Sequence, residues 1–178
     1  MQLLGPADPS PQTPKQRFKS YLLNTAGPVP LVGEALGSGI AQWTNSPPEW
    51  GQGWKAYGKR LGSNFAYNAV RQTISYAAAS AFHEDYRYFA APEPGPWRRV
   101  RHALIYTFTA RHSDGRDRFS VASVAGVVGA SGIASIWGPR SWQGAGNIAE
   151  NAGISFASTA GLNVVREFLP DILGRPRK

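Results

Sequence analysis

The sequence predicts a single all-α domain of five or six helices, and three observations support this fold class. Small residues recur at four-residue intervals, which places them on one face of an α-helix. Pro and Gly residues mark the ends of segments long enough to be helices. The chain has 178 residues, of which 42% are hydrophobic and 12% aromatic, enough to bury a core. We expect the helical domain at 13–172, between a flexible leader, 1–12, and a basic tail, 173–178.

Two short helices are expected first. Thr13 is a candidate N-cap with a Pro at the first helical position, so a basic helix is expected to run to about Asn24. Gly27 and the Pro after it end this helix. A second helix is expected at 31–44, with small residues at every fourth position.

A long helix is expected next, from Pro47 to about Phe82. The segment Ser46–Glu49 has the spacing of a capping box, with Pro in the first turn. An apolar stripe at three- and four-residue steps continues from it. Because several glycines weaken the helix by roughly 1 kcal/mol each, a break or kink is expected at 58–63.

The C-terminal half predicts three more helices, at 96–110, 120–137 and 142–169. The charged stretch 111–118 contains a Ser-Asp-Gly turn and is expected to be a loop. The β-branched residues of 121–128 leave a strand as the alternative for that segment.

Two ladders of small residues lie in the last two expected helices. The first contains Ala122, Gly126, Ala130 and Ala134, and the second contains Ala145, Ala149, Gly153, Ala157 and Gly161. Such ladders let another backbone approach closely. We expect the two helices to pack through these faces, Gly126 and Ala130 against Gly153 and Ala157, so that Gly153→Leu would damage folding.

The segment 119–139 contains no charged residue, and an Arg lies on each side of it. Its length would permit a membrane crossing, but four Ser and four Gly make insertion marginal. Three interpretations remain open: the buried core of a globular domain, a membrane-inserted or membrane-docked hairpin, and an oligomer interface.

The net charge of +8 favours anionic partners. The basic residues form dispersed clusters near expected helix ends, among them Arg98, Arg99, Arg101 and Arg118. A solvated surface, an anionic lipid surface and nucleic acid all fit such clusters, and nucleic acid fits least because no helix-turn-helix, RRM or zinc-finger pattern accompanies them. Most Trp residues lie near helix ends, as in interfacial belts and in ordinary core packing.

The densest polar cluster is His83-Glu84-Asp85, which together with a distant His such as His102 suggests a metal-dependent hydrolase. Its spacing matches no zinc signature. The alternative is a solvated helix end whose charges pair with nearby arginines. The chain has no cysteine, so disulfides and thiolate metal sites are excluded. No motif indicates a cofactor, a metal or a small-molecule ligand.

Four motifs are more specific than composition: SPPEWGQG at 46–53, YGKRLG at 57–62, HEDYRYF at 83–89 and EFLPD at 167–171. Together they resemble an uncharacterised family of bacterial proteins that an export signal often precedes. The resemblance covers about 13–172 and implies a cell-envelope setting, but no activity and no catalytic residue. Residues 1–4 are too short for the apolar core of a signal peptide.

These observations favour a non-enzymatic, membrane-associated or cell-envelope protein that acts through close helix packing and a basic, Trp-containing surface. Its expected partners are an anionic membrane or a second copy of the chain. A metal-dependent hydrolase and a nucleic-acid-binding protein are the alternatives.

Overall fold

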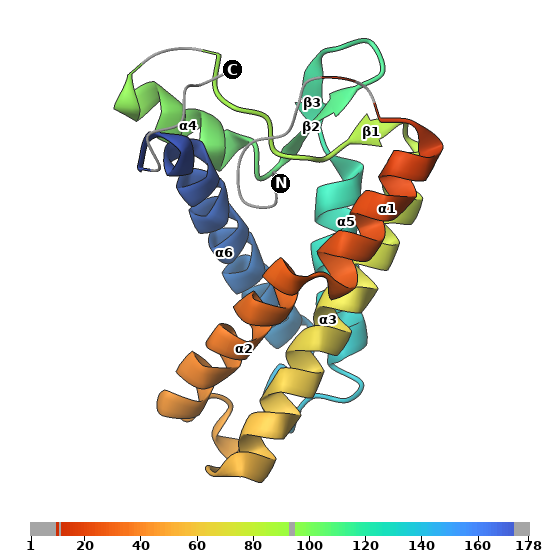
Figure 1. Cartoon of the computed structure of the whole chain (residues 1–178). Helices are drawn as coiled ribbons and strands as arrows, with labels where there is room; N and C mark the ends of the chain where they lie inside the picture. The colour runs from red at the N-terminus through yellow and green to blue at the C-terminus, as the bar shows by residue number, and fades with distance from the viewer. Residues whose placement is uncertain (1–9, 11, 93–94, 173–178) are drawn as a thin grey trace.

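Six α-helices form most of this computed structural model, which describes residues 10, 12–92 and 95–172 (Figure 1). They are α1 (Pro14–Ala26), α2 (Pro28–Trp43), α3 (Trp54–Ala81), α4 (Pro96–Ile105), α5 (Val121–Ala134) and α6 (Ala145–Ile172). Short 3-10 turns at Pro48–Trp50 and Arg140–Trp142 precede α3 and α6. The all-α class is confirmed. Residues 1–9 and 11 of the expected leader, and all of the expected tail at 173–178, lie outside the described residues.

α1 begins as its sequence predicts. The Thr13 hydroxyl accepts a hydrogen bond from the Gln16 N–H, and the Gln16 side chain accepts one from the Thr13 N–H, which is a complete capping box. Gly27 is both the C-cap of α1 and the N-cap of α2, so a single residue joins the two helices. A Cβ at this position would overlap the carbonyl oxygen of Leu23.

The long helix begins later than predicted, because two glycines interrupt the chain before it. Gly51 and Gly53 have φ values of 68° and 91°, which no residue of an α-helix adopts. The segment after Ser46 therefore forms only a short 3-10 turn, and α3 starts at Trp54. From there α3 is continuous to Ala81, without the break expected at 58–63.

A small antiparallel sheet replaces the predicted loop. β1 (Glu84–Asp85) pairs with β2 (Thr109–His112), which pairs with β3 (Asp117–Phe119). The turn between β2 and β3 contains Gly115, with a φ of 78°, so the Ser-Asp-Gly turn predicted there closes a hairpin. Pairing of β2 with two neighbours ends α4 at Ile105, five residues before its predicted end.

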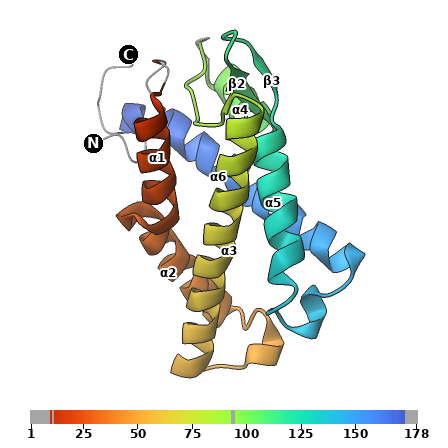
Figure 2. The same cartoon turned by 90° about the vertical axis from the view of Figure 1, so that its right-hand side faces the viewer.

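α3 is the central helix, and α1, α2 and α5 pack along it (Figures 1 and 2). α6 crosses α3, diverges from it and ends beside α4, while the sheet lies near the upper end of α3 (Figure 1). Within the described ranges, none of the helices combines the length and the apolar character needed to span a bilayer.

α5 and α6 are in contact as predicted, but their two small-residue ladders do not pack against each other. The ladder of α5 is buried, and it meets α3: a Cβ on Gly126 would overlap the Ser75 hydroxyl and lie 3.1 Å from the Arg71 carbonyl oxygen. The α6 residues Ala149, Gly153, Ala157 and Gly161 are exposed instead. α6 turns its hydroxyl and amide side chains inward, where partners on α3 and α4 bind them.

Candidate functional site

Glu84 is not free to bind a metal, because its buried carboxylate caps α5. The carboxylate accepts hydrogen bonds from the Ser120 hydroxyl at 2.8 Å, the Val121 N–H at 2.9 Å and the Ala122 N–H at 3.0 Å. Unpaired N–H groups and the helix dipole both favour a negative charge at this position. These contacts give Glu84 a structural role.

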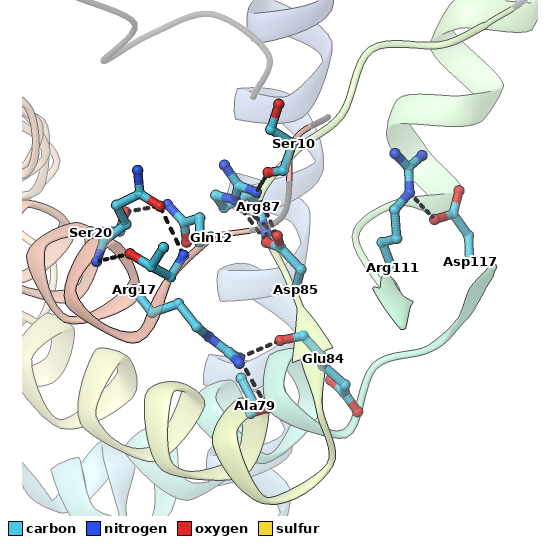
Figure 3. Close-up of polar contacts among 12 residues, drawn as sticks. Ser10, Gln12, Arg17, Ser20, Ala79, Glu84, Asp85, Arg87, Arg111 and Asp117 are labelled. Carbon is cyan, nitrogen blue, oxygen red and sulfur yellow. Dashed lines mark hydrogen bonds and ion pairs between the residues drawn. The ribbon is translucent and has the colours of Figure 1, made fainter. Parts of the chain in front are cut away.

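The neighbours of Glu84 are engaged in other contacts. Asp85 forms an ion pair with Arg87, with 2.6 Å between the closest atoms, and Arg87 also donates to the Ser10 carbonyl (Figure 3). Arg17 of α1 donates to the carbonyls of Ala79 and Glu84, at 3.1 and 2.6 Å (Figure 3). This arginine ties α1 to the end of α3 and to β1.

His83 and His102 do not complete a ligand set. His83 is exposed in the turn before β1. His102 lies on α4 against the rings of Tyr88 and Tyr106, where burial lowers its pKa despite the opposing charge of Glu167. In the described part of the chain, no three His, Asp or Glu residues are grouped closely enough to hold a metal ion.

Arg99, predicted as part of a basic surface, is buried in an ion-pair network with α6. Its Nε lies 3.1 Å from the Glu167 carboxylate, and its Nη1 lies 2.6 Å from Asp171. Glu167 is itself fully buried and also accepts from the Tyr88 hydroxyl at 2.6 Å. A buried guanidinium needs such acceptors, and the RR pair at 98–99 gave no sign of which Arg would turn inward.

The other three predicted basic residues lie on the surface. Arg98 and Arg101 are exposed on α4, and Arg118 is exposed on β3. Arg118 forms an ion pair with Asp114 across the hairpin. These residues do not form one patch with Arg99.

Arg60 is a buried residue that sequence reasoning missed. Its guanidinium donates to the carbonyls of Ser46, Pro47 and Gly51 at 2.8 to 3.0 Å, and to the Gln42 side chain at 2.5 Å. The SPPEWGQG segment is thus folded around one cation. The sequence signal that could have identified Arg60 was its position inside the YGKRLG motif.

The exposed side of α2 is apolar and uncharged. Its exposed large side chains are Leu31, Val32, Leu36, Ile40 and Trp43. Glu34, the single charged residue of α2, is buried. Trp54 at the start of α3 extends this surface, because Gln42 bonds to the carbonyl of Gly53 and brings the two helix ends together. Trp43 and Trp54 are 86% and 90% exposed. We call this set of six apolar side chains the α2 face.

A groove of about 510 Å³ adjoins the α2 face, between α2 and α3. Leu31, Leu61 and Phe65 line it, together with Gly58 and Gly62. The glycines have no side chains that could fill the groove on the α3 side. The apolar side chains around it make the groove suitable for hydrocarbon.

Glu34 also lines this groove. Burial raises the pKa of its carboxyl, and the nearby Asn68 amide offsets this only in part. Burial therefore favours the neutral carboxyl. The groove carries less negative charge than its sequence implies.

Two exposed lysines lie on the helix that forms one wall of the groove. Lys55 and Lys59 are each two residues from Tyr57, whose hydroxyl donates to the Ala35 carbonyl of α2, so both lie on the side of α3 that faces away from α2. An apolar surface on a chain with a net charge of +8 combines the two properties needed for contact with anionic lipid.

No protein-family model, curated protein or solved structure matches this chain.

Proposed function

We propose that the protein binds the surface of an anionic membrane through the α2 face and acts there as a structural or interaction protein of a cell envelope. The observation that carries this proposal is the uncharged apolar surface of α2. A water-soluble domain rarely exposes a large contiguous apolar patch without a partner for it.

The expected energies support peripheral binding. Fully burying a large apolar side chain contributes about 1.5–3 kcal/mol, and the α2 face presents six such side chains. Each basic residue near an anionic leaflet adds about 1 kcal/mol. Partial burial of the face is therefore sufficient for measurable binding without a membrane-spanning segment.

A vesicle-binding experiment tests the proposal. The full chain is sedimented with vesicles of phosphatidylcholine alone and with vesicles that also contain phosphatidylglycerol. We expect binding to the anionic vesicles and a blue shift of Trp fluorescence. The double variant Trp43→Ser/Trp54→Ser should bind at least tenfold more weakly, because it loses the two most exposed apolar side chains of the face.

Trp97→Ser is the matched control. Trp97 is 75% exposed on α4, at the opposite end of the molecule from the C-terminal end of α2 (Figure 1). This variant should bind like the wild type. Equal binding by the double variant, or no binding by the wild type, would rule out docking through the α2 face.

A further inference from the structure

The groove between α2 and α3 is lined by one ionisable group, the carboxyl of Glu34. Glu34 is only 9% exposed, and both of its carboxylate oxygens are shielded from water. A buried carboxylate is costly unless a cation or several hydrogen-bond donors accompany it. The surroundings of Glu34 therefore decide whether the groove is complete by itself.

The described part of the chain supplies little of this compensation. The polar neighbour of the Glu34 carboxyl is the Asn68 amide. The nitrogen of that amide also donates to the carbonyls of Asn24 and Thr25 in α1. Because a carboxylate accepts about four hydrogen bonds, one shared amide leaves most of its capacity unused.

The positive charges of α3 nearest to the groove are directed elsewhere. Lys55 and Lys59 lie on the side of α3 that faces away from α2. The Arg60 guanidinium binds the carbonyls of the segment before α3. Within the described ranges, Glu34 forms no ion pair. The groove thus combines an apolar lining with one negative site that has no positive counterpart among these residues.

The groove has the size of a ligand site. Its volume of about 510 Å³ lies within the range of about 300–1,000 Å³ that is typical of small-molecule pockets. The lining residues of α3 recur at three- and four-residue steps, so they share one face that extends for roughly 10 Å along the helix: Gly58, Leu61, Gly62 and Phe65. A Cβ on Gly58 or Gly62 would have no atom within 4 Å. An aliphatic chain fits along this open, apolar face.

We propose that the groove binds an amphiphile with a single aliphatic chain and a primary ammonium head group. The chain lies along the α3 face of the groove, and the flexible Glu34 side chain turns its carboxylate toward the ammonium. An ammonium is selected by charge complementarity, because it carries three N–H donors and the positive charge that Glu34 lacks. Where the carboxyl is neutral before binding, its proton passes to the solvent. This ligand site goes beyond the α2 face and does not require that face to dock on a membrane.

Calorimetric titration of the full chain with octylammonium, 1-octanol and octanoate tests the proposal. The three probes have the same chain length and differ in the head group. Octylammonium should bind at least about tenfold more tightly than 1-octanol, because hydrogen bonds to a charged group are the stronger ones, and octanoate should bind most weakly. No binding of octylammonium, or equal or tighter binding of either other probe, overturns the proposal.

Glu34→Gln separates the head group from the chain, since it removes the charge and keeps the size of the side chain. Its affinity for octylammonium should fall by about tenfold or more, while its affinity for 1-octanol stays that of the wild type. Retained binding of 1-octanol shows that the groove of the variant is intact. Unchanged affinity for octylammonium would mean that Glu34 does not bind the head group.

Gly62→Leu places a side chain in the groove, where the structure leaves open space. It should abolish the binding of octylammonium and of 1-octanol. Gly146→Leu is the matched control, because Gly146 is exposed on α6 with open space around it, and it should bind both probes like the wild type. Equal binding by Gly62→Leu and Gly146→Leu would place the chain elsewhere and overturn the site.

The variant Trp43→Ser/Trp54→Ser distinguishes this site from membrane docking. Neither Trp lines the groove, so the variant should keep its affinity for octylammonium even where it no longer binds vesicles. Loss of octylammonium binding in this variant would mean that the amphiphile binds the α2 face rather than the groove.

Discussion

α5 and α6 carry small residues at the same spacing, and they are held in the fold by different means. α5 lies against α3 along its small-residue ladder, and the Glu84 carboxylate caps its first turn. α6 leaves its ladder exposed and packs against α4 and α5 through other faces, which carry Phe156, Val164 and the Glu167 that pairs with Arg99. A small-residue ladder permits a close approach, but the polar groups on the other faces of a helix select which face turns inward.

The largest expected effect is the loss of the attachment of α6. Glu167→Ala should lower the free energy of unfolding by about 3–5 kcal/mol, because it leaves the Arg99 guanidinium partly unpaired in a buried position. Urea denaturation measures this change. Asp114→Ala removes an exposed ion pair with Arg118 and should cost less than about 1 kcal/mol. Similar losses in both variants would mean that Glu167 does not hold α6.

The next effect concerns the contact between α5 and α3. Gly126→Ala should cost about 2 kcal/mol, because its Cβ would force the Ser75 hydroxyl away from the Ala122 carbonyl that it binds. Gly132→Ala, on the same helix with open space around it, should instead stabilise by up to about 1 kcal/mol. If both variants gained stability in urea, α5 would not pack closely at Gly126.

A smaller effect is expected at the N-terminus of α5. Glu84→Ala should cost about 2 kcal/mol or somewhat less, because two N–H groups lose their acceptor. Glu150→Ala deletes an exposed carboxylate on α6 and should change stability by no more than about 0.5 kcal/mol. Amide hydrogen exchange should show faster exchange in the first turn of α5 for Glu84→Ala only. Unchanged protection there would contradict the capping role.

The smallest effect has the opposite sign. Gly153→Leu should stabilise by up to about 0.8 kcal/mol, since the site is exposed and Leu favours a helix. This outcome reverses the effect that the sequence pattern predicted. Loss of stability that grows with protein concentration would indicate instead that a second copy covers the α6 ladder in solution.

Local signals predicted the elements that depend on local contacts. The Thr13 cap of α1 is formed as expected from the sequence. The predicted start of α3 was wrong because the positive φ values of Gly51 and Gly53 override the capping pattern of Ser46. β1 was missed because its pairing with β2 links residues far apart in the chain.

The polar sites were the hardest to predict. Glu84, Arg99 and Arg60 all read as surface charges, and each is buried by a partner from a distant segment. Periodicity identifies the faces of a helix but not the neighbour of each face. The contact of Arg71 with Thr159 has no sequence signature, because it depends on the crossing of α3 and α6.

The one-residue joint at Gly27 couples the orientations of two helices. α1 cannot shift freely, because Arg17 donates hydrogen bonds to the carbonyls of Ala79 and Glu84. With Gly27 alone between α1 and α2, the direction of α2 follows from the position of α1. The orientation of the α2 face relative to the rest of the molecule is therefore determined at the far end of α1, where Arg17 is bound beside the cap of α5.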